Sequence, residues 1–238
     1  FVGRGAKIGF PIFELNKFNE IESYHLANVD KLFVCSEWAK NIVVENVKIS
    51  PNNVHVIPLG VDSTIFSPVA SARKETVFFN CGKWEVRKGH DILCEAFDRA
   101  FEPEDDVELW MMCANPFYTQ EENYDWERKY KTSKMGNKVK MIPKQKTQHS
   151  VADIMRTADC GVFPARAEGW NLELLEMMSC GKHVIATNYS GHTAFCDEDN
   201  CMLIETDTLE EANDGKWFNG EGEWAHIGDE QIDLIAAY

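Results

Sequence analysis

The chain has 238 residues, of which 39 are acidic and 24 are Lys or Arg, so its formal net charge is −15 at pH 7. This length predicts between one and two domains, and the 44% hydrophobic content is typical of a folded protein. The acidity excludes a broad binding surface for nucleic acid or for an anionic membrane, because either would need clustered Lys and Arg. A small anionic ligand is not excluded, since it needs only a local pocket of positive potential.

Neither a membrane span nor a secretion signal is predicted. No apolar run approaches the roughly 18 residues that a membrane span needs. The start has no initiator Met and no signal-peptide layout, so we expect a cut or processed end. The eight cysteines form no Cys-x-x-Cys pair and no set at zinc spacing, and most lie in apolar runs. This usage predicts buried, reduced thiols in a cytoplasmic protein.

In chain order, short apolar segments alternate with amphipathic ones. The predicted strands cover residues 7–13, 31–35, 54–58, 76–81, 107–113, 138–142, 160–164, 183–187 and 201–204. The predicted helices lie near residues 18–28, 36–47, 89–101, 121–133, 149–158, 171–180 and 229–237. Continuous apolar strands separated by amphipathic helices are typical of parallel βαβ units. We therefore expect an α/β fold with a Rossmann-like, doubly wound parallel sheet.

Two segments depart from this alternation. Residues 59–72 are rich in turn formers and have no clear periodicity, which indicates a linker. The part behind it has enough βα units for a complete Rossmann-like domain, whereas the part in front does not. Residues 207–224 are acidic, contain Gly and are weakly patterned, so the sequence indicates little about this stretch.

The segment from Cys160 to Gly181 predicts a ligand site. It has the pattern of a buried strand, a tight loop, a helix from about Asn171 and a Gly at the helix end. Gly169 in the loop lets the backbone come close to a ligand, and the N–H groups at the helix start suit a phosphate or diphosphate. In open α/β sheets such a loop lies beyond the carboxyl ends of the strands, where ligands bind.

Two glutamates of this segment are candidate ligands for hydroxyl groups. Glu168 lies in the loop and Glu176 lies one to two turns into the helix, so both can face the crevice. Two glutamates eight residues apart also occur by chance on solvated helices. Here the helix is rich in Leu and Met and is expected to be buried, and acidic side chains are seldom buried without a partner. The context therefore favours a functional role for the two glutamates.

A second candidate loop follows the strand predicted at residues 76–81. It places Lys83, Arg87 and Lys88 within six residues of a chain that is otherwise strongly negative. A run of charges is most often a solvated loop. The functional interpretation is that the two lysines bracket a diphosphate and offset the charge that builds on it as it leaves.

Together these segments resemble the retaining GT-B glycosyltransferases of family four, also called glycosyl transferases group 1. The family's E-x7-E motif corresponds to Glu168 and Glu176, and its basic segment corresponds to Gly82-Lys83 and Lys88-Gly89. Its passage between domains is similar to residues 56–62, and the resemblance runs over about residues 31–205. It implies an incomplete N-terminal, acceptor-side lobe in residues 1–62 and a nucleotide-sugar-binding domain in residues 63–238.

The resemblance also implies residue roles. Glu168 is expected to contact hydroxyls of the donor sugar and Glu176 to hold the ribose, while Lys83 and Lys88 neutralise the diphosphate. The base is expected near residues 141–143. Further donor-binding positions are implied, through the backbone, at Gly82, Gly169, Trp170, Asn171 and Leu172.

The implied activity is transfer of a sugar from a UDP- or GDP-sugar, with retention of configuration and without a protein-bound metal or other cofactor. The acceptor, whether carbohydrate, lipid or protein, is not identified by the sequence. Two alternatives stay open. The chain could be another GT-B enzyme, such as an epimerase or a phosphorylase, or it could bind a nucleotide sugar without catalysing transfer.

The sequence departs from the family pattern at several points. The first basic position is often Arg but is Lys83 here, which replaces a bidentate phosphate contact with a point charge. In the family, the N-terminal lobe often supplies a catalytic-site His; the resemblance implies that residues 1–62 correspond to only the end of that lobe, with Glu14 in the closest segment. A strand-end acid is an equally good interpretation of Glu14. The sequence Asp197-Glu-Asp199 fits an Asp-x-Asp metal motif, but a plain loop is favoured there.

Overall fold

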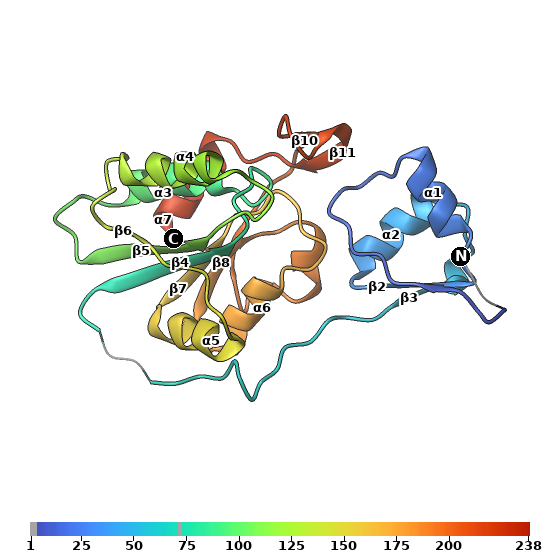
Figure 1. The fold of residues 1–238 in the computed structure, drawn as a ribbon, viewed down its shortest axis with the longest axis horizontal. Coiled ribbons are helices and arrows are strands. Elements are labelled where there is room, and N and C mark those ends of the chain that lie inside the picture. Colours follow the sequence, from blue (N-terminus) through green and yellow to red (C-terminus); the bar gives the residue numbers. More distant parts are fainter. Residues whose placement is uncertain (1–3, 71–72) are drawn as a thin grey trace.

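The computed structural model describes residues 4–70 and 73–238, and its largest unit is a six-stranded parallel sheet (Figure 1). The strands are β4 (Thr76–Gly82), β5 (Val107–Cys113), β6 (Val139–Met141), β7 (Cys160–Phe163), β8 (His183–Thr187) and β9 (Met202–Ile204). They lie in the order β6-β5-β4-β7-β8-β9, which is the 3-2-1-4-5-6 order of a Rossmann sheet when counted from β4. The predicted α/β fold with a doubly wound parallel sheet is confirmed.

Helices cover both faces of this sheet (Figure 1). One face carries α3 (His90–Ala100), α4 (Gln120–Lys131) and α7 (Asp229–Ala237), and the other carries α5 (Gln148–Thr157) and α6 (Leu172–Ser179). Alternate strand residues point to opposite faces, so Leu109 and Met111 pack with α3 while Val77 and Phe79 pack in the cluster that contains α5 and α6. Burial on both faces explains why the strands have continuous apolar sequences.

The first part of the chain forms a separate three-stranded parallel sheet. It contains β1 (Ile8–Gly9), α1 (Glu20–Ala27), β2 (Lys31–Val34), α2 (Glu37–Asn46), the 3-10 helix η1 (Pro51–Asn53) and β3 (Val54–Val56), with strand order β1-β2-β3. Asn19 and Ser36 cap the two α-helices through their side chains. The strand predicted at residues 7–13 is shorter than expected, because the chain leaves the sheet after Gly9.

Residues 59–70 of the predicted linker are packed against the large unit, and its last two residues, 71–72, lie outside the described residues. No helix or strand is found in residues 57–70 or in residues 73–75. Phe66 is buried, its carbonyl accepts a hydrogen bond from Ser179 Oγ at 2.6 Å, and Arg156 Nε donates to the carbonyl of Ser67 at 2.9 Å. These contacts tie the segment to α5 and α6.

A β-hairpin occupies the weakly patterned stretch about which the sequence indicated little. Strands β10 (Leu209–Asn213) and β11 (Asn219–Ala225) are antiparallel, and they lie on the side of the large unit that faces the three-stranded sheet (Figure 1). One face of the hairpin is buried through Ala212 and Trp224. The backbone N–H of Glu223 donates to Asn16 Oδ1 at 2.8 Å, so the hairpin also contacts the segment that follows β1.

Two sequence predictions concern the chain as a whole. In residues 4–70 and 73–238, no helix is long and apolar enough to cross a membrane. All eight cysteines carry free thiols, and all except Cys201 are buried. The predicted burial of the thiols is therefore confirmed at all but this position.

Candidate functional site

The two candidate loops meet where the strand order of the sheet reverses. Strands β4 and β7 are neighbours, and their following loops, residues 83–89 and 164–171, leave the same edge of the sheet. The loops are in direct contact, because Arg166 N donates to the carbonyl of Arg87 at 2.7 Å. Gly89 has a φ of 72°, and a Cβ there would lie 2.1 Å from the carbonyl oxygen of Pro164, so only glycine fits this contact.

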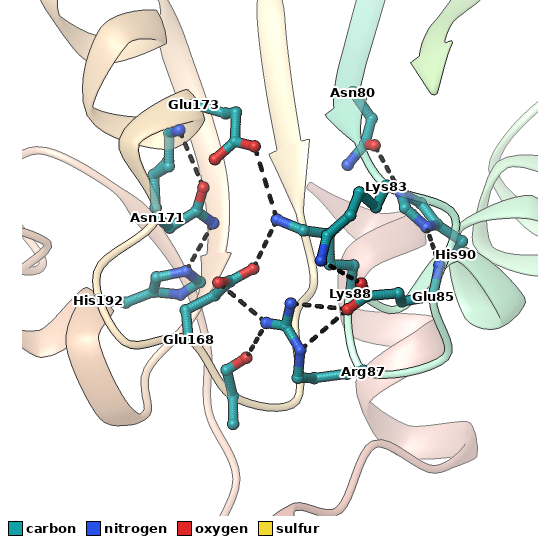
Figure 2. Close-up of polar contacts among 12 residues, drawn as sticks. Asn80, Lys83, Glu85, Arg87, Lys88, His90, Glu168, Asn171, Glu173 and His192 are labelled. Atoms are coloured by element: carbon teal, nitrogen blue, oxygen red, sulfur yellow. Dashed lines mark hydrogen bonds and ion pairs between the residues drawn. The ribbon is translucent and has the colours of Figure 1, made fainter. Parts of the chain in front are cut away.

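Glu168 lies at the centre of this contact, between two cations (Figure 2). Its Oε1 is 2.8 Å from Lys88 Nζ and its Oε2 is 2.9 Å from Arg87 Nη1, and the residue is only 6% exposed. Burial alone would raise the pKa of Glu168, but Arg87 and Lys88 together lower it to about 2. Glu168 is therefore a carboxylate at neutral pH and accepts hydrogen bonds without donating them.

A second carboxylate, Glu85, completes the cluster. Its Oε2 accepts hydrogen bonds from Arg87 Nε at 3.1 Å and Nη2 at 2.7 Å, and its Oε1 is 3.0 Å from Lys83 Nζ. Lys83, Arg87 and Lys88, which form a cluster of positive charge in an otherwise acidic chain, are thus each paired with a carboxylate. The sequence analysis did not single out Glu85, although an acid between Lys83 and Arg87 was a visible signal for such pairing.

Two buried histidines hold the loops to the sheet. His90 Nδ1 accepts from Glu85 N at 3.1 Å, so the proton is on Nε2, which lies 2.9 Å from Asn80 Oδ1 (Figure 2). Burial, and then the charges of Lys88 and Arg87, lower the pKa of His90 to about 3. His90 is therefore neutral, and it fixes the loop after β4 as a hydrogen-bonding group.

Asn171 and His192 fix the start of α6 in a corresponding way. Asn171 has a φ of 75° and its Oδ1 accepts from Leu174 N at 3.2 Å, which caps the helix. Its Nδ2 lies 2.9 Å from His192 Nε2, while His192 Nδ1 lies 3.0 Å from the carbonyl of Thr187. Burial lowers the pKa of His192, so the neutral ring accepts from Asn171 and donates to Thr187. The sequence analysis did not select either His90 or His192.

The other predicted backbone contacts of this loop have different surroundings. Gly169 faces the segment after β1, since a Cβ on it would lie 2.6 Å from Ile12 Cγ2 and 2.9 Å from the carbonyl oxygen of Phe13. Trp170 is buried against Phe195 at a ring-centroid distance of 4.9 Å. Leu172 is 42% exposed.

A cavity of about 340 Å³, here called the strand-end cavity, lies beyond the carboxyl ends of β4, β5 and β6. It is lined by Cys81, Gly82, Lys83, Met112, Ala114, Pro116, Lys144, Gln145, Val151, Glu173 and Glu176. In open α/β sheets this is the crevice in which ligands bind. Residues 141–143, where the base was expected, are not part of the lining, but the next two residues along the chain are.

The two glutamates of the E-x7-E motif have contrasting surroundings. Glu176 lines the strand-end cavity, and burial together with the neighbouring charge of Glu173 raises its pKa to about 7. Glu168 does not line that cavity and belongs to the ion-pair cluster instead. Lys88 links the two regions, because its Nζ lies 3.8 Å from Glu173 Oε1 as well as 2.8 Å from Glu168.

The structure also places the remaining candidates. Glu14 is partly buried near Arg87 and Glu168, and burial raises its pKa although Arg87 opposes the shift. Asp197 and Asp199 lie in an exposed turn, in which Asp199 N donates to Asp197 Oδ1 at 3.0 Å. The turn agrees with the plain loop that the sequence favoured. Over residues 4–70 and 73–238, no group of three side chains suited to hold a metal ion is found.

Comparison with solved structures confirms the GT-B type of fold. HepE from Anabaena, in a structure described as a complex with UDP and glucose, superposes with a TM-score of 0.69 at 15% identity, covering 82% of this chain and 56% of that one. Sucrose-phosphate synthase from Thermosynechococcus elongatus gives a TM-score of 0.68 at 20% identity, covering 91% of this chain and 56% of that one. At these identities the likeness establishes the fold alone.

Curated relatives match most of this chain but less than half of their own length. A phosphatidylinositol N-acetylglucosaminyltransferase subunit of Arabidopsis thaliana is 26% identical in an alignment 215 positions long, which covers 85% of this chain and 46% of that protein. The D-inositol 3-phosphate glycosyltransferase of Stackebrandtia nassauensis is 26% identical over 196 residues, covering 77% of this chain and 44% of that protein.

A family model settles the assignment. The model described as glycosyl transferases group 1 matches residues 75–214, which is more than half of the chain and includes both candidate loops and the strand-end cavity. The chain therefore belongs to the glycosyl transferases group 1 family.

Proposed function

We propose that this chain binds a nucleotide diphospho-sugar and takes part in transferring the sugar to an acceptor. The observation that carries the proposal is the strand-end cavity, whose volume of about 340 Å³ is within the range of small-molecule sites. Its lining brings together Gly82, Lys83 and Glu176, three positions that the family resemblance implies for the donor. The names of similar proteins support the proposal, since HepE was solved with UDP-glucose.

We propose that the diphosphate binds between Lys83 and Lys88. Lys88 is shared between Glu168 at 2.8 Å and the more distant Glu173 at 3.8 Å, and Lys83 has a side chain that is 44% exposed. A diphosphate approaching from the strand-end cavity would replace Glu173 as the second partner of Lys88. Fixed cations at this position would stabilise the charge that develops on the leaving nucleotide.

The electrostatics support different roles for the two glutamates. Glu168 has a pKa of about 2 and is held by Lys88 and Arg87, so it cannot act as a general acid near neutral pH. It can accept hydrogen bonds from hydroxyls of the donor sugar. Glu176 has a pKa of about 7 and lines the cavity, where it can accept from the ribose hydroxyls once it is ionised.

The finer parts of the proposal rest on the family resemblance. They are the choice of UDP or GDP, retention of configuration, transfer without a protein-bound metal, and the division into lobes at residues 1–62 and 63–238. A cytoplasmic location is proposed on the free, mostly buried thiols.

A donor panel tests the proposal. The purified chain is incubated with UDP- and GDP-linked hexoses and N-acetylhexosamines, and release of the nucleotide and the anomeric configuration of the released or transferred sugar are followed by NMR. Turnover of one donor with retention is expected. Epimerised donor would instead indicate another GT-B activity. Binding without turnover would support the alternative of a chain that binds the donor without catalysing transfer. The proposal would be refuted if the chain neither bound nor turned over any of the donors.

A further inference from the structure

An exposed aromatic cluster lies next to the ion-pair cluster and has no part in the donor site described above. Phe117, from the loop after β5, is 68% exposed, and Trp217, from the turn of the hairpin, is 45% exposed. Their ring centroids are 6.0 Å apart, and Trp217 also stacks on Tyr118 at 6.5 Å. A contiguous exposed apolar surface on a folded protein is typical of a binding site.

The hairpin turn is fixed in place, so the aromatic surface is preformed. Asp214 Oδ1 accepts hydrogen bonds from the backbone N–H groups of Lys216, Trp217 and Phe218 at 2.9, 2.7 and 2.9 Å. Lys216 forms an ion pair with Glu122 of α4, and its Nζ lies 4.1 Å over the ring of Tyr118. Preorganisation of this kind lowers the entropy cost of binding a ligand.

The rings of Phe117 and Trp217 line a cavity of about 220 Å³, here called the aromatic cavity. It is lined by Glu14, Lys83, Glu85, Arg87, Phe117, Trp217 and Phe218. The polar part of the lining contains two carboxylates and two cations, so it has no strong preference for a charged ligand. It does offer both hydrogen-bond acceptors and donors opposite flat apolar rings. A pyranose ring has the matching chemistry, since it presents a C–H face together with a rim of hydroxyl groups.

The aromatic cavity lies between two other cavities. It shares Lys83 with the strand-end cavity, where the nucleotide is proposed to bind. It shares Glu14, Trp217 and Phe218 with a larger cavity of about 590 Å³ that runs along residues 11–18 and α1. A sugar in the aromatic cavity would therefore lie between the nucleotide and a space large enough for a longer acceptor.

We propose that the aromatic cavity binds one neutral pyranose ring, stacked on Trp217 and Phe117, with its hydroxyls bonded to Glu14 and Glu85. The ring belongs either to the donor or to a glycan acceptor, and in both cases the inference rests on the proposed function. The hairpin turn, through Trp217, thereby becomes a specificity element of the transfer site.

Binding measurements on the wild-type chain and on variants that lack the indole ring of Trp217 test this inference. Titrations of the wild-type chain use UDP, UDP-glucose, GDP, GDP-mannose, methyl glucosides, methyl mannosides and glucose 1-phosphate. The same ligands are then measured with Trp217→Ala, with Trp217→Phe, and with Tyr124→Ala. Tyr124 is a matched control, because it is 58% exposed on α4 and lines none of the three cavities.

The expected result is a loss of about tenfold in the affinity for a nucleotide sugar or for a methyl glycoside with Trp217→Ala, partial recovery with Trp217→Phe, and no change with Tyr124→Ala. Affinity for the free nucleotide should not change. A loss seen only for the nucleotide sugar places the donor's ring in the cavity, and a loss seen for the methyl glycosides places an acceptor ring there. Glycoside binding that depends on Trp217 without any nucleotide binding would uphold this inference while refuting the proposed function. The inference is overturned if Trp217→Ala binds every nucleotide sugar and every methyl glycoside as the wild type does, if the wild type binds neither kind of ligand, or if glucose 1-phosphate alone binds.

Discussion

At the scale of single residues, two glutamates of one motif are held in opposite electrostatic states. Glu168 is buried between Arg87 and Lys88 and has a pKa of about 2, whereas burial and the neighbouring charge of Glu173 raise the pKa of Glu176 to about 7. Burial raises the pKa of both carboxyl groups, so the difference comes from the charges beside them. One is a permanent acceptor, and the other titrates near neutral pH.

Replacing Glu168 with Gln is expected to lower the free energy of unfolding at pH 7 by about 3 kcal/mol, because it leaves buried cations without their partner. The folded pKa of Glu168 lies below the ordinary value of 4.5, so its stabilisation is present above pH 4.5 and is lost as the pH falls towards 2. Urea unfolding at pH 7 measures the effect. The exposed Glu104→Gln is the control, and equal stability of the two variants would contradict the prediction.

Glu176 is expected to show the opposite dependence on pH. Its folded pKa is raised above 4.5 to about 7, so the folded state is favoured when the carboxyl is protonated. The stability of the wild type should therefore fall as the pH rises from 4.5 to 7, and Glu176→Gln should be the more stable protein at pH 8 but not at pH 4.5. Thermal unfolding at both pH values checks this, and a difference of the same size at both would contradict it.

The pairing of these residues could be predicted only in part. The sequence identified Lys83, Lys88 and Glu168 because each lies in a recognisable strand–loop–helix segment. It could not show that Lys88 and Glu168, 80 residues apart, neutralise each other, because a local pattern contains no information on such a partner. The neutral histidines were missed for the same reason, since their role depends on which backbone groups surround them.

At the scale of secondary-structure elements, the start of α6 depends on one residue in an unusual conformation. Asn171 adopts a left-handed φ of 75°, caps Leu174 N, and donates to His192. Asn tolerates this region because its side chain can bond locally, while other residues with a Cβ are strained there.

Asn171→Ala is expected to destabilise the chain by about 2 kcal/mol, because it removes the cap and keeps the strained φ. Asn171→Gly should cost less, since glycine adopts the left-handed region freely. Chemical denaturation of both variants measures the difference. If the glycine variant were as unstable as the alanine variant, the conformational part of this explanation would be wrong.

The secondary-structure elements differ in how well the sequence predicted them. The six strands of the Rossmann sheet were predicted because burial on both faces makes each a continuous apolar run. The hairpin was missed because only Ala212, Gly222, Trp224 and Ala225 of its strands are buried, and the glycines at 220 and 222 weaken its strand pattern. The hairpin depends on tertiary contacts that no local pattern contains.

At the scale of the whole molecule, Arg166 joins the parts that surround the site. Its guanidinium makes two 2.8 Å bonds to the carboxylate of Asp91 at the start of α3, donates to the carbonyl of Val86 at 2.6 Å, and contacts Glu210 of the hairpin at 3.3 Å. The hairpin in turn contacts the segment after β1 through Asn16. The two loops, α3 and the hairpin thus form one connected structure.

Arg166→Met is expected to loosen the hairpin more than the sheet, because it removes the bonds to Glu210 and Asp91 while leaving the strand ladder intact. Hydrogen exchange should become faster in residues 209–225 and in residues 83–89, with little change in β5. A uniform increase over the whole chain would indicate general destabilisation and would contradict a local role.

The central claim is that a nucleoside diphosphate binds beyond the ends of β4, β5 and β6, with Lys88 as a main partner of the phosphates. Calorimetric titration with UDP and with GDP tests it most directly. The wild-type chain and the control Lys48→Ala, whose side chain is exposed on the three-stranded part, are predicted to bind one of these nucleotides. Lys88→Ala is predicted to lose at least about tenfold in affinity, which corresponds to one charge-assisted phosphate contact. Failure of the wild type to bind either nucleotide, or unchanged binding by Lys88→Ala, would contradict the claim.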